Sequence, residues 1–294
     1  MGGAKATSTQ SAVSSTTASS AGGASSTATS VDTSTSTDGG GTGGTQMADP
    51  CDSAIFCEDF ESYSSGEVPG GAWSAQTNLG SVSVDTSRQV SGSNSVRFDT
   101  EASDASKTAY LRLEGGDVFP VENNVYYGRM LFFLESAPTE SVHWTFIQGG
   151  GTVPGQSYRA LYRYGGQHPV DGSSQLMANY ETPDSYSGNG PSSDCWQHAQ
   201  SVVVPVGRWS CVEWMFDGGA NEMRLWLDGT AIDSLTVMGS GEGCVASDFG
   251  NVWTAPNFET LDIGWESYQA DDARTLFVDD VVISAEPIGC PALP

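Results

Sequence analysis

The sequence predicts an all-β fold, a two-sheet antiparallel jelly-roll sandwich, and three observations lead to that prediction. Beyond the first part of the chain, short segments of alternating or continuous apolar residues recur between turns rich in Gly, Pro, Asn and Asp. No window of about 12 residues combines a helical apolar period with helix caps. A dozen or more strands at this spacing are typical of sandwiches and jelly rolls.

The first 48 residues have a different composition. From Gly2 to Gln46 nearly every residue is Ser, Thr, Ala or Gly, and the only large aliphatic residues are Val13 and Val31. Such a stretch buries too little apolar surface to offset the entropy lost on ordering it. We therefore expect residues 1–48 to be a disordered Ser/Thr/Gly-rich linker and residues 49–294 to be the jelly-roll domain, which has about 240 residues from which to build a core.

The predicted strands are separated by clear turn signals. Gly149–Gly151 and Asp217-Gly218-Gly219 interrupt the apolar pattern, and Asp228-Gly229 between two alternating segments is a strong hairpin signal. The segments expected to be strands are residues 81–85, 95–99, 109–113, 125–134, 142–148, 158–164, 175–180, 201–204, 210–216, 222–227, 231–236, 260–265 and 276–284.

The charge balance limits the partners of the protein. The chain carries 36 acidic and 11 basic residues, a formal charge of −25. This balance repels phosphate backbones and anionic lipid, so we expect no nucleic acid partner. The longest apolar run, Met130–Leu134, is too short to cross a bilayer, so we expect no membrane insertion. We expect a monomer. Five of the arginines fall between residues 97 and 163, which leaves room for a local basic patch (Arg97, Arg112, Arg129, Arg159 and Arg163).

The cysteines indicate the compartment. There are six, all in the predicted folded part, and none forms a Cys-x-x-Cys pair, so disulfides fit better than zinc. Disulfides imply an oxidising environment. We expect a secreted or cell-surface anchored protein whose export signal is absent from this chain. Because sandwich termini are often neighbours, we first expect Cys290 to join Cys51 or Cys57. The pairing among Cys195, Cys211 and Cys244 stays open.

Several sequence motifs together resemble one superfamily. They are EDFES (58–62), VSGSNSVRF (90–98), GRWSCVEWMFDG (207–218), RLWLDG (224–229) and LFVDDVVIS (276–284). Their order resembles the concanavalin A-like lectin/glucanase superfamily, and within it the polysaccharide-lyase-like branch that includes glucuronan lyases and their cellulose-induced relatives. The resemblance covers residues 54–284. It implies a concanavalin A-like jelly roll whose partner is a polysaccharide.

The resemblance also implies a structural calcium ion (Ca2+) between the first and last strands. Calcium takes oxygen ligands from carboxylates, hydroxyls, amides and carbonyls. The matching positions are Glu61, Ser91, Asn94 and Asp279. Asp280 is the alternative to Asp279, and Asp279 is preferred because the two point to opposite faces of their strand. The alternative interpretation is that these are polar residues on an outer face.

Three kinds of function are open to such a fold. A glycoside hydrolase needs two carboxylates across the scissile bond. The sequence lacks the Glu-x-Asp-x-Glu strand of the glucanases, and Asp217, four residues after Glu213, begins a turn. A hydrolase is therefore the minor alternative.

A polysaccharide lyase acting by β-elimination on uronate-containing chains is the preferred hypothesis. It needs a group that neutralises the uronate carboxylate and a base that removes the neighbouring proton. We predict Arg163 and Asn179 as neutralisers and His143 or Tyr180 as the base. The predicted substrate-binding residues are Arg129, Gln148, Trp144, Glu266 and Tyr268. The sequence has neither the Arg-Ser/Thr-Glu-Leu/Val-Arg strand nor the Gln-Ile-His strand of alginate-lyase-like members.

A non-catalytic carbohydrate-binding module of the same fold is the main alternative. Such modules present aromatic rings to the apolar faces of sugars. The side chains available for this are Trp144, Trp196, Trp253, Trp265, Tyr180 and Tyr268. Tryptophans are equally suited to a sandwich core, so composition alone does not separate the two hypotheses.

Overall fold

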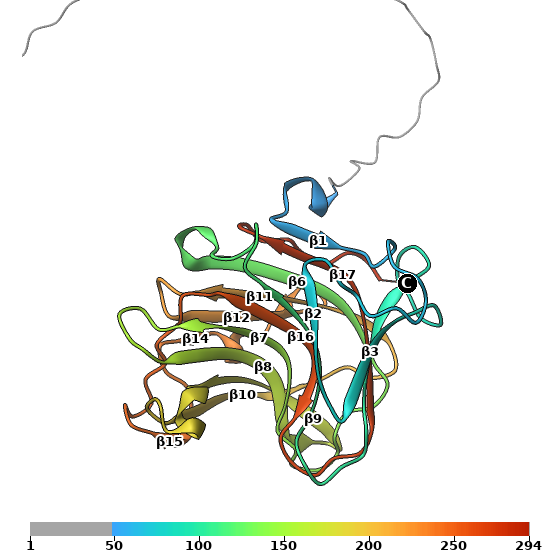
Figure 1. Cartoon of the computed structure of the whole chain (residues 1–294). Coiled ribbons are helices and arrows are strands. Elements are labelled where there is room, and N and C mark those ends of the chain that lie inside the picture. The colour runs from blue at the N-terminus through green and yellow to red at the C-terminus, as the bar shows by residue number, and fades with distance from the viewer. Residues whose placement is uncertain (1–48, 294) are drawn as a thin grey trace, which may run out of the picture. The chain divides into compact units, whose positions relative to one another are not determined.

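Two antiparallel β-sheets packed face to face make up the computed structural model of the chain, which describes residues 49–293 (Figure 1). The predicted linker, residues 1–48, lies outside the described residues. Within residues 49–293 the helical segments are four short 3-10 turns, and no α-helix occurs. These turns are η1 (Pro50–Ser53), η2 (Glu122–Asn124), η3 (Pro183–Ser187) and η4 (Asp233–Leu235). The predicted fold class is confirmed.

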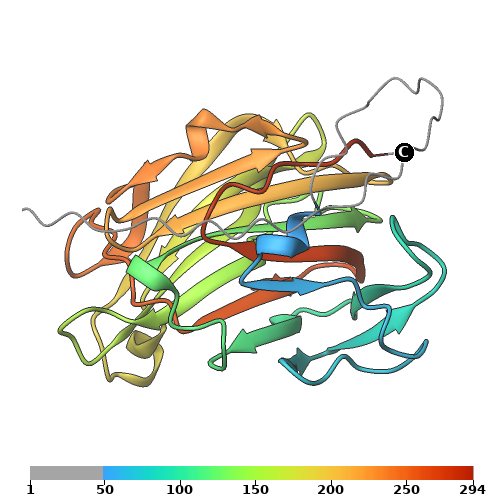
Figure 2. The same cartoon turned by 90° about the horizontal axis from the view of Figure 1, so that it is seen from above.

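Sheet A contains nine strands and brings the opening and closing segments of the domain together. Its order is β13 (Thr230–Ala231), β12 (Glu222–Leu227), β11 (Trp209–Asp217), β6 (Val125–Leu134), β17 (Arg274–Ser284), β4 (Ser95–Thr100) and β3 (Gly80–Asp85). In addition, β14 (Val237–Met238) pairs with β12, and β1 (Phe56–Glu58) pairs with β17. Phe56 lies opposite Ile283, and Figure 2 shows β1 beside the last strand.

Sheet B contains eight strands and carries the residues of greatest chemical interest. Its order is β15 (Gly243–Ser247), β10 (Ser193–Val203), β9 (Ser173–Glu181), β8 (Arg159–Val170), β7 (Trp144–Thr152), β16 (Thr260–Ser267), β5 (Lys107–Glu114) and β2 (Trp73–Asn78). Neighbouring strands are antiparallel throughout.

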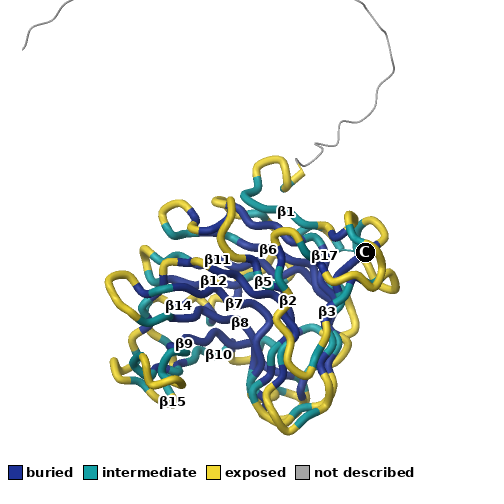
Figure 3. Tube along the Cα trace, in the orientation of Figure 1, coloured by how far each residue is buried: buried dark blue, intermediate teal, exposed yellow. Residues whose placement is uncertain are grey.

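The core lies between the two sheets and is rich in aromatic residues. Strand alternation sends one set of side chains inward. The trace in Figure 3 is buried along most strands of both sheets. Trp144 and Trp265 stack with ring centroids 4.5 Å apart. Gly128 leaves room for Trp214, because a Cβ there would lie 2.1 Å from the indole ring. Burying each such ring contributes roughly 1.5–3 kcal/mol.

Several of the predicted strands differ from the structure, among them 201–204, which is only the end of β10, and 158–164, since β8 continues to Val170. The opening strand ends at Glu58, because the Glu58 and Asp59 carboxylates accept hydrogen bonds from the backbone of Phe60 and Glu61 and turn the chain. Residues 231–236 form the end of β13 followed by η4, which buries Leu235. The strands β2 and β15 were not predicted: β2 is exposed and largely polar after Trp73, and β15 is a short Gly-Cys-Val-Ala-Ser segment without clear alternation.

The disulfides pair Cys51 with Cys57, Cys195 with Cys244, and Cys211 with Cys290. The expectation that Cys290 joins Cys51 or Cys57 is wrong. The C-terminal segment runs across β11, where the Glu213 carboxylate accepts hydrogen bonds from the backbone of Ile288 and Gly289. This contact brings Cys290 to Cys211. In the part of the chain that the structure describes, no helix is long and apolar enough to cross a membrane.

Candidate functional site

A line of hydrogen-bonded charged and amide side chains crosses the outer face of sheet B, the face opposite to the core. We call it the polar ladder, and its members are Arg112 (β5), Asp262 (β16), Gln148 (β7), Arg163 (β8) and Glu181 (β9). Since neighbouring strands lie about 4.8 Å apart, five strands span roughly 19 Å. The ladder is therefore long enough to lie beneath several sugar rings.

Each step of the polar ladder is a direct contact. Arg112 holds Asp262 with two nitrogens, at 2.7 and 2.9 Å. The Gln148 amide nitrogen donates to Asp262 at 2.6 Å, and its amide oxygen accepts from Arg163 Nε at 2.6 Å. Arg163 Nη1 forms an ion pair with Glu181. Because charges and hydrogen bonds are matched along the line, these buried groups are fixed in position.

Asn179 and Asp194 form a side branch beside Arg163. The Asn179 amide nitrogen donates to Asp194 at 2.9 Å and to the Cys195 carbonyl at 2.8 Å. Its amide oxygen lies 3.5 Å from Arg163 Nη1. Asn179 is thereby oriented with its oxygen toward the guanidinium.

Tyr268 packs over Arg163 and joins the ladder to an acidic residue. The Arg163 guanidinium carbon lies 5.4 Å from the centre of the Tyr268 ring. The Tyr268 hydroxyl donates to Glu266 at 2.9 Å and lies 3.0 Å from the Thr145 hydroxyl. Burial raises the pKa of Tyr268, Arg163 lowers it and Glu266 raises it, and the net shift is upward. The phenol is therefore protonated at neutral pH.

His143 lies beside Tyr268, with ring centroids 4.6 Å apart. Burial and the positive charge of Arg163 lower the pKa of His143 to about 3, so its imidazole is uncharged at neutral pH. Its Nε2 atom is buried and has no hydrogen-bond partner among residues 49–293. An uncharged imidazole has one ring nitrogen that is able to accept a proton or a hydrogen bond, and a ligand reaches Nε2 only when the groups that cover it move.

The other two histidines of the chain lie near His143. His198 Nδ1 lies 2.9 Å from Glu242, and His168 Nδ1 lies 2.7 Å from the Ser141 hydroxyl. The His168 and His198 ring centroids are 5.3 Å apart. Both rings lie close enough to His143 to lower its pKa, after the larger effects of burial and Arg163.

The residues predicted to bind calcium meet around one loop of the other sheet. Glu61 accepts hydrogen bonds from the backbone of Ser93 and Asn94, and Asp279 accepts them from Val90 and Ser91. The Asn94 amide nitrogen donates to the carbonyls of Phe60 and Tyr63, and the Ser91 hydroxyl donates to Asp280.

These residues fit a cation by two observations. No Lys or Arg of residues 49–293 lies within ion-pair distance of Glu61, Asp279 or Asp280, and burial raises the pKa of Asp279 to about 6. In addition, Gly92 has φ +55°, and a Cβ there would lie 2.3 Å from the Glu61 carboxyl carbon. No group of three His, Cys, Asp or Glu side chains among the described residues is arranged to hold a metal, so any site here depends on amide, hydroxyl or carbonyl oxygens as well.

Comparisons with known proteins agree with this architecture. The family model for the core domain of Cip1-like, polysaccharide-lyase-like proteins matches residues 59–286. The chain belongs to this family. Membership places the chain among carbohydrate-acting proteins of the polysaccharide-lyase-like type.

One solved structure supports the fold, and others of lower similarity are found beside it. The structure of Cellulose induced protein, Cip1, is 24% identical, and the match covers 80% of this chain and 100% of that chain with a TM-score of 0.59. The binding domain of botulinum neurotoxin DC in complex with SialylT is 12% identical over 81% of this chain and 49% of that chain, with a TM-score of 0.46. Domain 4 of AbnA, a GH43 extracellular arabinanase from Geobacillus stearothermophilus, is 14% identical over 72% and 81%, with a TM-score of 0.38. A search of curated protein sequences finds no match.

Most of the predicted site residues meet on one face of the Cip1-like domain. His143, Arg163, Asn179, Gln148, Glu266 and Tyr268 all lie on or beside the polar ladder. Tyr180 and Trp144 do not, since strand alternation turns both into the core, where each is fully buried. The hydroxyl of a ring between the sheets is not available to a sugar.

Arg129 lies on β6 in sheet A, away from the ladder. It lines a cavity of about 600 Å3 together with Asp280 and the Cys51–Cys57 disulfide. Sequence reasoning placed Arg129 with the substrate because it follows Tyr127 on an arginine-rich part of the chain. Topology separates it, because β6 and β8 belong to different sheets.

Sequence reasoning missed four members of the ladder and its branch, namely Arg112, Asp262, Glu181 and Asp194; Arg112 entered only as part of a possible basic patch. Asp262 had a usable signal, because it lies in the predicted strand 260–265, four residues before Glu266. Glu181 follows directly after the predicted strand 175–180, and Asp194 precedes Cys195 in a segment that was not predicted to be a strand. No sequence motif marked either residue as part of a site.

Proposed function

We propose that the protein is a secreted polysaccharide lyase that cleaves uronate-containing chains by β-elimination at the polar ladder. The observation that carries the proposal is the arrangement of His143, Tyr268 and Arg163. An uncharged imidazole and a protonated phenol lie side by side above a fixed guanidinium. β-Elimination needs a base, an acid and a positive charge near the uronate carboxylate, and these three groups supply them.

The roles follow from the protonation states. His143 takes the proton from C5 of the uronate, the C4–O4 bond breaks, and a C4–C5 double bond forms. Tyr268 donates its proton to the departing O4, so the step is balanced. A pKa of about 3 would make His143 a weak base, but a bound uronate carboxylate beside the imidazole raises it again. Binding of the substrate thus makes His143 a stronger base.

Arg163 acts mainly through its electric field. The side chain is 7% exposed and is held by Gln148 and Glu181, so its position does not depend on the ligand. A preorganised charge in a largely buried environment stabilises developing negative charge better than one that must reorganise. The Asn179 amide oxygen lies beside Arg163 Nη1, and its amide nitrogen donates to Asp194.

A structural calcium ion and an extracellular location belong to the same proposal. Glu61, Asp279 and the Asn94 amide would hold the ion, with Ser91 beside them. The ion would offset the negative charge of the carboxylates. It would also tie the turn after β1, the loop 90–94 and β17 together. Three disulfides are compatible with an extracellular protein.

The test is to incubate the full chain with a panel of polyuronates and uronate-containing heteropolysaccharides. A lyase produces the ultraviolet absorbance of an unsaturated uronate end. We expect His143→Gln and Tyr268→Phe each to lower the rate by about 10²–10⁴, as is typical of lost acid–base catalysis. Tyr127→Phe, in the other sheet, is the matched control and should leave the rate unchanged. Reducing ends without that absorbance would establish a hydrolase and refute the proposal.

A non-catalytic binding module remains the second candidate, and one observation favours it. The donors of Arg163 already meet Gln148, Asn179 and Glu181, so the ladder is complete without a ligand. Against it, Trp144, Trp265, Trp253 and Tyr180 are core residues and offer no exposed platform. Retention on polysaccharide with no product from any substrate would favour the module.

A further inference from the structure

Tyr186 is an exposed aromatic residue at the β9 end of the polar ladder. It belongs to η3, the turn after β9, and is 77% exposed, the largest exposed fraction among the large hydrophobic residues of the described chain. Despite this exposure its hydroxyl donates to Glu181, the last member of the ladder. The second oxygen of Glu181 binds Arg163. One buried carboxylate therefore connects the exposed ring directly to the candidate catalytic charge.

The turn that carries Tyr186 is held by contacts at both ends. Pro183 begins it, and Gly188 ends it with a left-handed backbone (φ 72°). The Asp184 carboxylate accepts a hydrogen bond from the backbone of Arg159 at 2.7 Å. The Thr182 hydroxyl donates to the Pro191 carbonyl and accepts from the Ser193 backbone.

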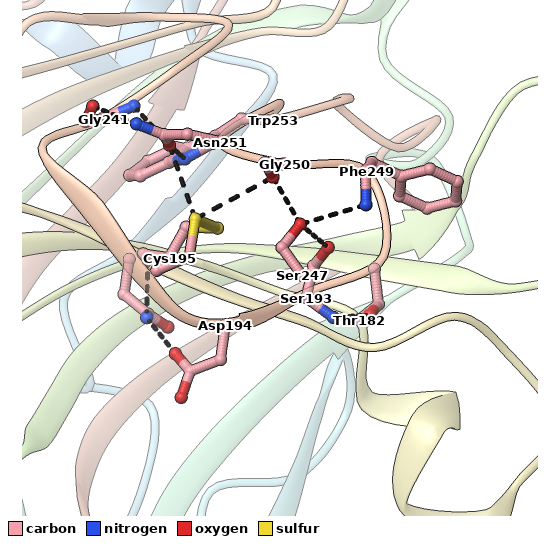
Figure 4. Close-up of a disulfide and its surroundings, with 12 residues drawn as sticks. Thr182, Ser193, Asp194, Cys195, Gly241, Ser247, Phe249, Gly250, Asn251 and Trp253 are labelled. Carbon is pink, nitrogen blue, oxygen red and sulfur yellow. Dashed lines mark hydrogen bonds between the residues drawn. A yellow bond between two sulfur atoms is a disulfide. The ribbon is translucent and has the colours of Figure 1, made fainter.

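A second loop braces the first. Asp248 and Ser192 exchange two hydrogen bonds of 2.7 Å, and the hydroxyls of Ser193 and Ser247 lie 3.1 Å apart. On the same pair of strands the Cys195–Cys244 disulfide joins β10 to β15, beside Ser193 and Ser247 (Figure 4). Because the turn is fixed before any ligand arrives, an exposed ring on it can bind without a large cost in ordering.

The charges around Tyr186 are mainly negative. Burial and the charge of Asp194 raise the pKa of its hydroxyl, while Arg163 lowers it. Glu266 also raises it, Glu181 and Asp184 are further acidic residues beside the ring, and Arg163 is already paired with Glu181. A uronate carboxylate would be repelled here, whereas the apolar face of a neutral pyranose suits the open ring.

We propose that Tyr186 forms a subsite that stacks a neutral sugar next to the uronate bound at Arg163, so that the substrate is a heteropolysaccharide and not a homopolyuronate. This inference rests on the proposed lyase function. It also agrees with the formal charge of −25, which opposes the approach of a densely charged polyanion.

The experiment compares binding and turnover in three variants of the full chain. Tyr186→Ala removes the ring, Tyr186→Phe keeps the ring but loses the contact with Glu181, and Tyr127→Ala is the control on the other sheet. Binding of cello-, xylo- and manno-hexaose is measured by calorimetry. We expect at least one hexaose to bind, and Tyr186→Ala to weaken it about 3- to 10-fold, in line with a single stacking contact. Tyr186→Phe should weaken it less, and Tyr127→Ala should have no effect.

Turnover is then measured on a homopolyuronate and on a glucuronoxylan or another chain in which neutral sugars adjoin uronates. We expect kcat/KM to favour the mixed chain and Tyr186→Ala to raise KM for it while kcat changes little. Equal turnover of both polymers, or hexaose binding that is absent or unaffected by Tyr186→Ala, would overturn the subsite. If no polymer is cleaved but hexaose binding depends on Tyr186, the lyase proposal fails and the neutral-sugar subsite stands.

Discussion

Glu61, in the turn after β1, and Asp279, in β17, both accept hydrogen bonds from the backbone of the loop 90–94. Asp279 accepts hydrogen bonds from Val90 and Ser91, and Glu61 accepts them from Ser93 and Asn94. The carboxylates approach from two sides, and no basic side chain of residues 49–293 pairs with either. This relationship leads to two predictions about stability.

The first prediction concerns calcium removal. If calcium binds at Glu61 and Asp279, a chelator should lower Tm by roughly 5–11 °C, since ligand at 100 times its Kd stabilises a fold by about 2.7 kcal/mol and each kcal/mol shifts Tm by about 2–4 °C at this size. Thermal unfolding with calcium and with chelator measures the difference. Asp279→Asn should abolish it. Identical Tm values for the parent protein in both conditions would argue against a calcium site.

The second prediction concerns Gly92. An alanine Cβ at this position would meet the Glu61 carboxyl at 2.3 Å on a backbone with φ +55°. We expect Gly92→Ala to lower the free energy of unfolding by about 1–3 kcal/mol more than the backbone strain of an alanine at positive φ does by itself. Gly207→Ala is the matched control, because Gly207 also has positive φ (+68°) but nothing within 4 Å of the added Cβ. Equal losses in both variants would remove any special role for the Glu61 contact.

The third prediction concerns the buried ion pair of the ladder. Glu181→Gln leaves the Arg163 guanidinium buried beside a neutral amide, and breaking such a pair typically costs about 3–5 kcal/mol. Denaturant unfolding should show this loss. Glu135→Gln breaks the exposed pair with Arg88, at 3.6 Å, and should cost less than about 1 kcal/mol. A small effect at Glu181 would mean that Arg163 is neutralised by other groups.

The fourth prediction concerns pH. The folded state holds the pKa of His143 near 3, below its unfolded value of about 6.5, so the unfolded chain binds more protons between these pH values. The stability contributed at His143 is therefore present above pH 6.5 and is lost as pH falls toward 3, by at most about 1.4 kcal/mol per pH unit. His143→Gln should flatten the profile over this window. Parallel profiles for the two proteins would contradict the shift.

Strand alternation in the sequence was enough to predict the sandwich and most of its strands, because each strand has one core face. It also identified Arg163 and Asn179, which lie opposite each other in the register of β8 and β9. Alternation could have separated Tyr180 from Asn179, since adjacent residues of a strand face opposite sides. Tyr180 was instead offered as the base by residue type, whereas the tyrosine that lies at the site is Tyr268, which the proposal uses as the acid beside His143.

Other features depend on contacts between distant segments, which no local pattern reveals. Tyr186 lies in a turn and reaches the ladder only because η3 folds back over Glu181. The pairing of Cys290 with Cys211 depends on the path of the C-terminal segment across Glu213. The grouping of His143 with His168 and His198 requires the order of strands in sheet B.

The register of β7 against β8 has one further consequence. Thr145 lies opposite Gly165 and Ile147 lies opposite Tyr164, so Phe146 is an extra residue in a β-bulge. If Phe146 were kept in a regular strand, simple alternation from Thr145 would turn Gln148 inward and send Ile147 to the sugar side. The bulge absorbs the extra residue, so Phe146 and Ile147 both face the core and Gln148 stays between Asp262 and Arg163. In a comparison of relatives, a single-position gap between Thr145 and Gln148 should therefore mark a strand without the bulge in which the glutamine still faces the sugar side.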